Sequence, residues 1–492
     1  MSRVPQVRIR KTNEKPVRPH GKYVLYWMIA NRRLTYNFSL DRALEHCESL
    51  GKPLMVLEAL RVDYPWANDR IHDFVLDGMA DNAQNCASHG AEYFPYIEPK
   101  PGAGKGLLAA LAENACVVVT DDFPCFFLPR MIASAAKQLP VRLEAIDSNG
   151  LLPIHATDHV ALRAFDFRRY LQKELPAHLE HFPQANPLHK GNSPPAVPVL
   201  KSIRDKWPVA SPRLLSNQDG ALARLPIDHG VRPTAQRGGS QAASAHMKEF
   251  LNERFPEYAE LRNDPDDDVT SGLSPYLHFG HLSVHELFSQ IVKREKWHAQ
   301  RLSLRANGNR EGWWNMSANA EGFLDQVITW RELGYNFTSH RGDYDRYESL
   351  PDWSGKTLKK HARDKRKYVY SLEQFETAAT HDRLWNAAQT QLVREGRLHN
   401  YLRMLWGKKI LEWSPTPEKA LEIMIHLNNK YGLDGRNPNS YSGIFWILGR
   451  YDRAWGPERP IFGTIRYMSS ANTVRKVSVQ NYVRKYSQAA WL

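Results

Sequence analysis

The chain has 492 residues and a formal net charge of +13, with 42% hydrophobic and 24% charged residues. It is too long for a single hydrophobic core, and its composition is that of a soluble globular protein of two or three domains. No apolar run approaches the length of a membrane span, and the first twenty residues lack the apolar centre of a signal peptide, so we expect no membrane partner. The positive charge favours a polyanionic partner, nucleic acid first and an acidic membrane surface second.

All four cysteines lie within the first 125 residues of the chain, and none belongs to a CxxC pair. This usage indicates reduced thiols in a cytoplasmic protein. It excludes an iron–sulfur cluster with cysteine ligands in the C-terminal half, and we predict no metal site. The expected location is the cytoplasm, with association with the nucleoid in a bacterium or a place in the nucleus of a eukaryote.

Residues 1–20 are basic and contain proline, and we interpret them as an N-terminal tail. Segments of this composition are usually disordered arms. A contact with nucleic acid and an amphipathic targeting segment are the alternatives.

Residues 21–180 alternate between apolar runs and helical patterns. An apolar run from Tyr23 is followed by a helix with Ala43, Leu44 and Cys47 on one side, and then by the apolar run LMVLEAL. The pattern continues with helices at 69–88 and 106–114 and with strands at 92–97, 115–122 and 141–150. Strands that alternate with helices predict a doubly wound α/β domain.

Residues 181–245 are rich in proline and have no sustained period, which predicts a long interdomain linker. Residues 246–492 are mainly helical in pattern, and no internal repeat is present. The expected fold is therefore a doubly wound α/β N-terminal domain joined by a long linker to an all-helical C-terminal domain.

Five tryptophans lie between residues 385 and 455, more than a helical core requires, because each brings an N–H group that needs a partner when buried. Trp406 and Trp413 are two helical turns apart and so lie on one face. Gly396 predicts a turn that folds the preceding helix back and brings Trp385 toward Trp406. One interpretation is a path that passes electrons to a buried redox cofactor. The alternative is a core filled by large aromatic side chains.

A hydroxyl-rich stretch, TSGLSPYLHFGHLS, spans residues 270–283. Thr270, Ser271 and Ser274 can bind phosphate oxygens, and Gly272 allows close approach of the backbone. Helix capping explains half of the same pattern. As a string, T-S-x-L-S-P-Y-L-x-x-G resembles the flavin phosphate-binding signature of the DNA photolyase and cryptochrome family.

Four further strings are similar to class II cyclobutane pyrimidine dimer photolyases in particular: RMLWGKKILEW, LDGRNPN, DRAWG and FGTIRYMS. The resemblance covers roughly residues 21–486 and is densest from Arg237 onward. It implies an antenna-type α/β domain at 21–180 and a helical catalytic domain at 246–492 that binds FAD. It also implies light-driven repair, in which the excited reduced flavin donates an electron to a dimer flipped out of double-stranded DNA.

The resemblance assigns residues to the flavin. Arg403 and Asp434 resemble the ion pair beside it, although a surface turn with Arg403 in solvent is the alternative. Asn428 resembles the asparagine that faces flavin N5. The full set implied for cofactor binding is Tyr258, Thr270, Ser271, Gly272, Leu273, Ser274, Arg403, Asn428, Asp434 and Gly435. The tryptophans implied to reduce the flavin are Trp406, Trp385 and Trp413.

The resemblance also assigns residues to DNA. Trp330 and Trp446 resemble the indoles that line the lesion pocket, and Met404 matches a methionine beside the dimer. The residues implied to enter the gap in the duplex are Arg453 and Trp455, and Arg466 resembles a phosphate contact. We expect a monomer with FAD and, in the first domain, either an antenna chromophore, for which 8-hydroxydeazaflavin and folate are the candidates, or none.

The sequence departs from the family at one position. Gln326 stands where a glutamate ordinarily hydrogen-bonds the dimer, and a glutamine cannot deliver a proton. We therefore expect slower repair, unless a shift of register puts Asp325 or Glu332 in this place. The departure favours the alternative of a cryptochrome-like flavin photoreceptor with weak or no repair activity. A flavoenzyme with a diffusible reductant is disfavoured because the chain has no GxGxxG.

Overall fold

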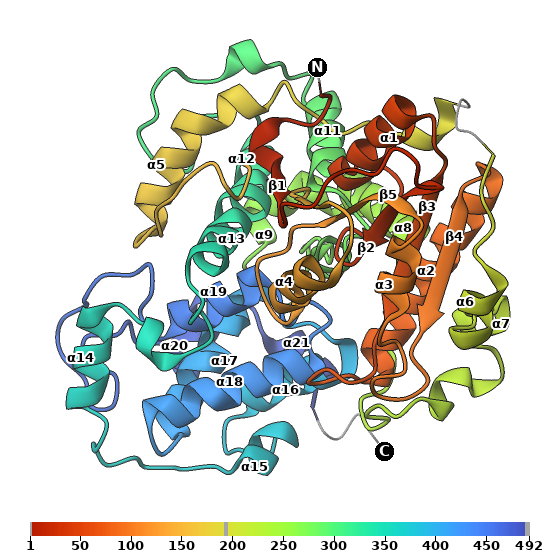
Figure 1. Cartoon of the computed structure of the whole chain (residues 1–492). Coiled ribbons are helices and arrows are strands. Elements are labelled where there is room, and N and C mark those ends of the chain that lie inside the picture. Colours follow the sequence, from red (N-terminus) through yellow and green to blue (C-terminus); the bar gives the residue numbers. More distant parts are fainter. Residues whose placement is uncertain (1, 191–194, 488–492) are drawn as a thin grey trace. The chain divides into compact units, whose positions relative to one another are not determined.

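The structure, a computed structural model, describes residues 2–190 and 195–487 (Figure 1). The parts of our predictions that fall on Met1, on residues 191–194 of the expected linker and on residues 488–492 of the expected helical domain lie outside the described residues. The chain divides into two compact units. The α/β unit comprises Met1–Thr157, Glu174–Met247 and Leu273–Lys296, and the helical unit comprises Asp158–Lys173, Lys248–Gly272 and Trp297–Leu492.

Among the described residues, a six-stranded sheet forms the centre of the α/β unit. Its strands are β1 (Ile9–Lys11), β2 (Tyr23–Met28), β3 (Leu54–Leu60), β4 (Glu92–Ile97), β5 (Ala115–Asp121) and β6 (Leu143–Ile146). Their order is β1-β6-β5-β2-β3-β4, and every pair except β1 with β6 is parallel. All residues of β2 and β5 are buried, as expected for parallel strands that helices cover on both faces.

The helices between these strands are α1 (Phe38–Leu50), α2 (Asp69–Ser88), α3 (Leu107–Ala112) and α4 (Leu128–Gln138). In α1 the Asn37 side chain accepts hydrogen bonds from the first N–H groups, and Gly51, with a φ of 63°, ends the helix in the left-handed conformation. The predicted face with Ala43, Leu44 and Cys47 is buried. The doubly wound α/β prediction is confirmed, and α4 is an addition to it.

The interpretation of residues 1–20 as a disordered arm is wrong for residues 6–11. A short 3-10 helix, η1 (Gln6–Arg8), leads into β1, which forms an antiparallel edge strand on β6. The Arg8 guanidinium is buried, donates to the Leu151 carbonyl at 2.7 Å, and lies 4.7 Å from the centre of the Phe38 ring. A strand of three residues gives too short a pattern to be predicted from sequence.

The expected linker packs against the α/β unit. The Trp207 indole N–H donates to the Ala103 carbonyl at 3.0 Å, and the Ala210 N–H donates to the Pro95 carbonyl at 2.8 Å. This segment contains η3 (Pro187–Lys190), α6 (Lys201–Lys206), α7 (Pro212–Leu215), η4 (Gln218–Arg224) and the start of α8 (Gly239–Glu249), and η2 (Leu175–His178) precedes it.

Two helices that we expected in the helical domain, α10 (Ser274–Phe279) and α11 (Val284–Arg294), belong to the α/β unit. The Phe74 ring of α2 packs against Tyr276 at 5.4 Å and against Phe279 at 5.3 Å. A Cβ on Gly280 would lie 2.1 Å from the Ala30 carbonyl oxygen, so the two backbones meet there. The sequence places a domain boundary in the linker, whereas these packing contacts extend the α/β unit beyond it.

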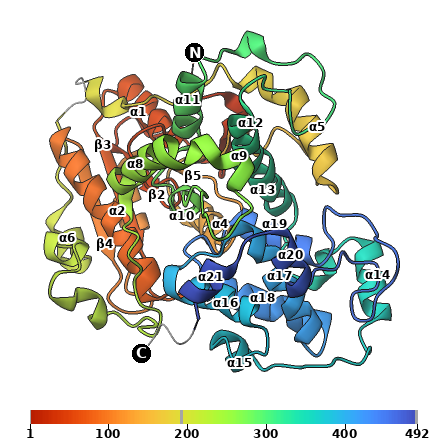
Figure 2. The same cartoon turned by 180° about the vertical axis from the view of Figure 1, so that it is seen from behind.

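The helical unit is all-helical in its regular structure, apart from isolated bridges, over the residues that the structure describes (Figure 2). Its first elements are α5 (Ala164–Glu174), the π-helix η5 (Phe250–Arg254), η6 (Phe255–Glu257), α9 (Tyr258–Leu261), η7 (Ala299–Arg301), α12 (Ala318–Leu324), the π-helix η8 (Asp325–Trp330) and α13 (Arg331–His340). The others are η9 (Tyr347–Ser349), α14 (Asp352–Lys360), α15 (Leu372–Glu376), α16 (Arg383–Glu395), α17 (Asn400–Trp413), α18 (Pro417–Tyr431), α19 (Pro438–Ile447), α20 (Ser470–Lys476) and α21 (Gln480–Lys485).

Helix α17 packs against α16, α18 and α19, and α19 also packs against α13. The approach of α13 to α19 depends on Gly334, because a Cβ there would lie 2.8 Å from the Asn439 backbone. This packing fixes the helices that carry the predicted tryptophans.

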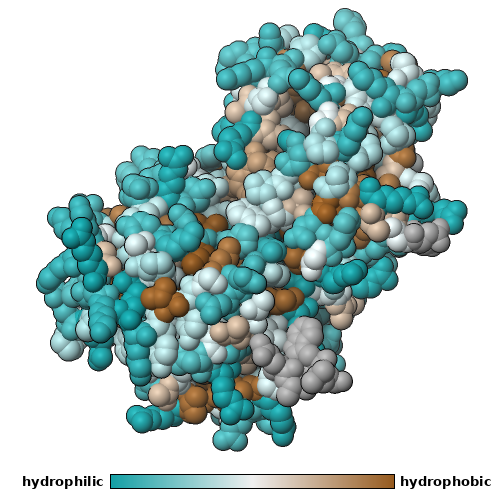
Figure 3. All heavy atoms as spheres, turned by 90° about the horizontal axis from the view of Figure 1, so that it is seen from below, coloured by the Kyte–Doolittle hydropathy of each residue, from teal (hydrophilic) through white to brown (hydrophobic). Residues whose placement is uncertain are grey.

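The face drawn in Figure 3 is mainly hydrophilic, with separate hydrophobic spots. Exposed large hydrophobic side chains are few among the described residues, and the tryptophan among them is Trp455, at 38% exposure. In the described part of the chain no helix has both the length and the apolar character needed to span a membrane.

Candidate active site

Helices α16 and α17 bring the three predicted electron-transfer tryptophans together. Trp385, Trp406 and Trp413 are each at most 2% exposed. The rings of Trp385 and Trp413 lie 5.9 Å apart, and the Trp385 indole N–H donates to the Trp406 backbone carbonyl at 3.0 Å. Gly396, with a φ of 67°, ends α16 as the sequence predicted, and α17 then runs back along it.

The cluster continues outward through residues that sequence reasoning missed. The Trp413 ring contacts Tyr370 at 5.6 Å and His381 at 5.0 Å, and the Tyr370 hydroxyl lies 2.6 Å from Nδ1 of His381. His381 is exposed, so aromatic side chains lead from a buried tryptophan to the surface. No periodicity could have revealed this, because both residues lie outside regular elements and meet Trp413 only in the folded chain.

Arg403 and Asp434, which the sequence predicts to pair, form an ion pair. The Arg403 guanidinium on α17 lies 3.2 Å from Oδ2 of Asp434, and both side chains are mostly buried, which removes the alternative of an arginine in solvent. Arg436 holds the Asp434 loop by donating to the carbonyls of Asn429, Gly432 and Leu433 at the end of α18. A Cβ on Gly435 would lie 2.6 Å from the Asn428 carbonyl oxygen, so the loop requires glycine there.

The amide of Asn428 is buried at the C-terminal end of α18 and donates to the Asn429 side chain at 3.2 Å. Tyr258 is also buried, and its ring packs against Phe250 at 5.9 Å and Phe323 at 5.2 Å. Asn428 therefore lies beside the Asp434 loop, whereas Tyr258 lies in an aromatic core cluster.

The predicted phosphate-binding stretch crosses from the helical unit, which holds Thr270 to Gly272, to the α/β unit, which holds Leu273 and Ser274 at the start of α10. The Thr270 hydroxyl donates to Asp268 at 2.6 Å. Burial alone would raise the pKa of Asp268, but the hydrogen bond and charge of Arg397 outweigh burial and lower it. The predicted phosphate-binding stretch therefore begins beside the ion pair of Asp268 and Arg397.

The two predicted lesion-pocket indoles stack on each other. The rings of Trp330, on η8, and Trp446, on α19, have centroids 4.4 Å apart and planes inclined by 15°. Both rings are partly exposed. Met404 on α17 and Gln326 on η8 are also partly exposed. The structure thus presents a flat aromatic pair, of the kind on which a planar base can stack.

Asp325, one of the two acids that a shifted register would substitute for Gln326, is engaged elsewhere. Its carboxylate pairs with Arg168 at 2.9 Å and accepts the indole N–H of Trp330 at 3.1 Å. The other acid, Glu332, is buried on α13. The role predicted for Gln326 stays a prediction.

The three predicted duplex contacts meet around one exposed indole. The guanidinium groups of Arg453 and Arg466 lie 4.9 Å and 5.4 Å from the centre of the Trp455 ring. The Trp455 indole N–H donates to Asp452 at 3.0 Å, a contact that sequence reasoning missed. Two guanidinium groups thus lie beside an exposed ring whose N–H is bound to a carboxylate. Such a surface is suited to contact DNA phosphates and to fill a gap between unstacked bases.

A buried cation lies in the same helical unit. Lys408 on α17 is 1% exposed, and its ammonium group donates to the Ile447 carbonyl. Burial lowers the pKa of Lys408 to about 7, and the positive charge of Arg466 adds to the effect while Asp452 opposes it.

No family model matches the chain, but long matches to known proteins exist. A deoxyribodipyrimidine photo-lyase of Methanothermobacter thermautotrophicus is 34% identical over 482 residues, which cover 97% of this chain and 97% of the relative. The one from Potorous tridactylus is 33% identical over 472 residues, with 94% of this chain and 81% of the relative covered. The chain belongs to the DNA photolyase/cryptochrome family.

Solved structures of the photolyase/cryptochrome family have the same fold. A bacterial class III photolyase from Agrobacterium tumefaciens matches with a TM-score of 0.68 at 17% identity, over 95% of this chain and 86% of that chain. A cryptochrome of Synechocystis matches with a TM-score of 0.65 at 15% identity, over 94% and 88%. Members of this family generally bind FAD.

Two buried side chains fit a bound cofactor of this photolyase/cryptochrome type. Oε1 of Gln389 on α16 accepts the Trp406 indole N–H at 2.9 Å, while Nε2 has no partner among the described residues. Neither ring nitrogen of His399, the residue before α17, has a hydrogen-bond partner there, and burial lowers the pKa of His399 to about 4. Unsatisfied buried polar groups cost about 1 to 3 kcal/mol each, which a cofactor with hydrogen-bonding edges would offset.

In the α/β unit, the strand order reverses between β2 and β5, the place where open sheets of this kind bind ligands at the carboxyl ends of the strands. The Asp121 side chain occupies part of this ligand-binding position. Its carboxylate accepts the backbone N–H groups of Ile29, Ala30 and Asn31 at 2.8 to 3.0 Å and the Tyr26 hydroxyl at 2.8 Å.

An aromatic cluster lies in the loops that follow β3 and β5. The Tyr64 ring is 5.6 Å from Phe127, and the Trp66 ring stacks against Phe126 at 6.2 Å. The Arg61 guanidinium lies 5.7 Å from the Phe127 ring. These side chains offer aromatic faces to a planar ligand.

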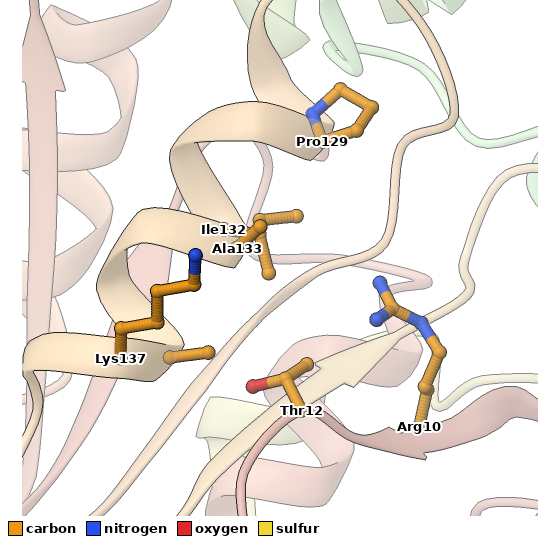
Figure 4. A pocket seen from close by; sticks show the side chains of 7 residues that line it. Arg10, Thr12, Pro129, Ile132, Ala133 and Lys137 are labelled. Atoms are coloured by element: carbon orange, nitrogen blue, oxygen red, sulfur yellow. The ribbon is translucent and has the colours of Figure 1, made fainter. Parts of the chain in front are cut away.

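A cavity of about 400 Å³ opens between α4 and the β1 side of the sheet (Figure 4). Arg10 and Lys137 contribute cationic groups and Ile132 an apolar wall. The Arg10 guanidinium is neutralised by Asp122 at 2.6 Å; burial opposes ionisation of this acid, but the hydrogen bonds from Arg10 and His155 hold its pKa at about 2. No predicted site residue lines this cavity, and we assign it no ligand.

Proposed function

We propose that the protein repairs cyclobutane pyrimidine dimers in DNA with light, by electron transfer to a dimer flipped out of the duplex. The observation that carries this proposal is the exposed Trp455 ring between Arg453 and Arg466, in the same unit as the stacked pair of Trp330 and Trp446. A pure photoreceptor has no need of a cation-flanked indole at its surface.

FAD would be held by the residues around the Arg403 and Asp434 pair, with Asn428, Gly435 and residues 270–272 of the same helical unit completing the site. When bound, it supplies the photoexcited electron donor. Arg403 places a positive charge in this site, and Asp434 fixes the orientation of that charge. An antenna chromophore, 8-hydroxydeazaflavin or folate, would stack on the aromatic cluster of Tyr64, Trp66, Phe126 and Phe127.

Electrons that keep the cofactor reduced would travel inward along the aromatic side chains. The indole N–H groups of Trp385 and Trp406 donate to a carbonyl and an amide oxygen, neither of which is basic enough to remove a proton. Both indoles therefore retain their protons when an electron leaves. At the outer end, His381 Nδ1 is placed to receive the hydroxyl proton of Tyr370.

DNA would bind through charge first. Arg453 and Arg466 neutralise phosphates independently of sequence, while Trp455 fills the space left by an extruded dimer. The dimer would then stack on the indole pair, with Met404 beside it. The proposal includes a monomer acting on double-stranded DNA, in the cytoplasm or wherever the cell keeps its DNA.

A second candidate is a cryptochrome-like flavin photoreceptor with weak or no repair, and Gln326 favours it. A glutamine at this place hydrogen-bonds a dimer but delivers no proton to its radical anion. The basic cluster and the stacked indoles favour repair.

The deciding experiment compares light with darkness. The purified protein is loaded with FAD, reduced, mixed with duplexes that carry either a cyclobutane dimer or a (6-4) photoproduct, and illuminated with blue light. Loss of the cyclobutane dimer in light alone is the expected result. Loss of the (6-4) photoproduct instead would mean that this lesion is the substrate. If neither lesion is lost, the proposal of repair is wrong and the photoreceptor is the function to be tested next.

Replacing Trp455 with alanine should weaken binding to a dimer-containing duplex by roughly tenfold in darkness, because one buried aromatic contact is lost. The salt dependence of binding should stay the same, since the indole is uncharged. In Arg466→Gln the slope of log Kd against log salt should fall by about one. The measurement is a titration of labelled duplex at several salt concentrations.

Leu304→Ala is the matched control, because Leu304 is an exposed hydrophobic residue of the same unit. Its affinity should equal that of the parent. Unchanged affinity in Trp455→Ala would remove the indole from the DNA interface.

A further inference from the structure

A buried ion pair lies directly behind the stacked indoles. The Arg168 guanidinium, on α5, contacts both oxygens of Asp325, at 2.9 Å and 3.3 Å, and both side chains are less than a tenth exposed. Arg168 reaches this place from a segment 157 residues earlier in the chain. Breaking such a pair by removing one partner is strongly destabilising, whereas replacing both partners with apolar side chains is often neutral.

The same carboxylate holds an indole. Oδ2 of Asp325 accepts the N–H of Trp330 at 3.1 Å, and the Trp330 ring then stacks on Trp446 at 4.4 Å. One oxygen therefore bonds to both the buried arginine and the partly exposed indole. A rotation of the Trp330 ring would break this hydrogen bond.

The π-helix η8 makes this arrangement possible. Asp325 and Trp330 are its first and last residues, five positions apart. In an α-helix of 3.6 residues per turn, such residues point in directions about 140° apart. A π-helix bonds each residue to the fifth one along, which brings the two side chains to nearly the same face.

We propose that the Arg168 and Asp325 pair positions Trp330, fixing the plane of its indole so that the stacked pair is ready to receive a base. The pair acts through Trp330 and touches no substrate. A ring fixed before binding loses less conformational freedom on binding, which raises affinity. This inference rests on the proposed function for the identity of the base, a dimer, but the orientation of Trp330 is a property of the protein alone.

The test separates orientation from stability. In Arg168→Leu/Asp325→Leu the ion pair is replaced by apolar side chains, so the double variant should unfold at a urea concentration close to that of the parent. The tryptophan N–H groups are labelled with ¹⁵N in protein free of flavin and DNA, and the Trp330 signal is assigned by its loss in Trp330→Phe. In the double variant this signal should shift and exchange faster with solvent. Dark affinity for a dimer-containing duplex should fall by roughly tenfold.

Two further variants sharpen the result. Arg168→Leu/Asp325→Asn keeps an oxygen acceptor for the indole while removing both charges, so it should retain the Trp330 signal better than the first double variant. Asp166→Asn is the matched control, because Asp166 also lies on α5 and its exposed ion pair joins it to Arg163, the residue before this helix. It should leave the signal and the affinity as in the parent.

Recovery of the parental Trp330 signal and dimer affinity in the stable double variant would overturn the inference, because the pair would then be merely structural. A lost signal with unchanged affinity would overturn it as well. Failure of the proposed function looks different: the parent itself would neither bind dimers in preference to intact duplex nor lose them in light, while the Trp330 signal would still report the effect of the pair.

Discussion

Replacing Trp406 with phenylalanine should slow photoreduction of the oxidised flavin by at least about a hundredfold, which corresponds to about 2.7 kcal/mol in barrier. Trp406 is 2% exposed, and its backbone carbonyl accepts the N–H of Trp385, which joins the two tryptophans across α16 and α17. Phenylalanine fills most of the same space but is far harder to oxidise. The measurement is the loss of the absorbance of the oxidised flavin under blue light with an external electron donor.

Repair by protein that was reduced beforehand should continue at a rate near that of the parent, because in the proposed mechanism the electron returns from the dimer and no new electron is needed. Trp207→Phe is the matched control: Trp207 is also buried and donates its N–H to a backbone carbonyl, but it lies in the α/β unit. Equal photoreduction in Trp406→Phe and the control would mean that electrons take another route.

Lys408 should make the protein less stable at neutral and acidic pH than at alkaline pH. Burial lowers its pKa to about 7 in the folded chain, from 10.5. Between these values the unfolded chain binds the proton and the folded chain does not, so the free energy of unfolding rises with pH across this window. The destabilisation caused by burying Lys408 is therefore greatest below about pH 7 and disappears above about pH 10.5. At about 1.4 kcal/mol for each pKa unit, the full change is about 5 kcal/mol.

Lys408→Met removes this dependence. The free energy of unfolding of the variant minus that of the parent should fall by about 5 kcal/mol between pH 6 and pH 10.5. The advantage of the variant is therefore greatest at acidic pH. Urea unfolding at a series of pH values measures it. Lys419→Met, at an exposed lysine on α18, is the control and should give a constant difference. A constant difference for Lys408→Met as well would contradict a depressed pKa.

Local patterns in the sequence were enough to predict the main elements. The apolar runs at 23–28, 54–60 and 115–121 form parallel strands, and Gly396 ends α16 as its turn signal indicated. Seven-residue spacing also placed Trp406 and Trp413 on one helix. Such predictions succeed because the period and the breaking residue act within a few positions of each other.

Contacts between segments far apart in the sequence could not be predicted from local patterns. Arg168 meets Asp325 across 157 positions, and Tyr370 reaches Trp413 from an irregular segment. The packing of α10 and α11 on α2 likewise depends on tertiary contacts, such as those of Phe74, that no local period contains. The roles of the individual site residues rest on the family resemblance and await the variants described above.

Asp121 limits what the α/β unit is able to hold. In sheets with this strand order, backbone N–H groups at the reversal commonly grip the diphosphate of a dinucleotide. Here the side chain of Asp121 already accepts the backbone N–H groups of Ile29, Ala30 and Asn31, so these donors are occupied and are not offered to a phosphate. A ligand at this edge of the sheet would therefore have to bind without those backbone donors, although the strand order is that of a nucleotide-binding sheet.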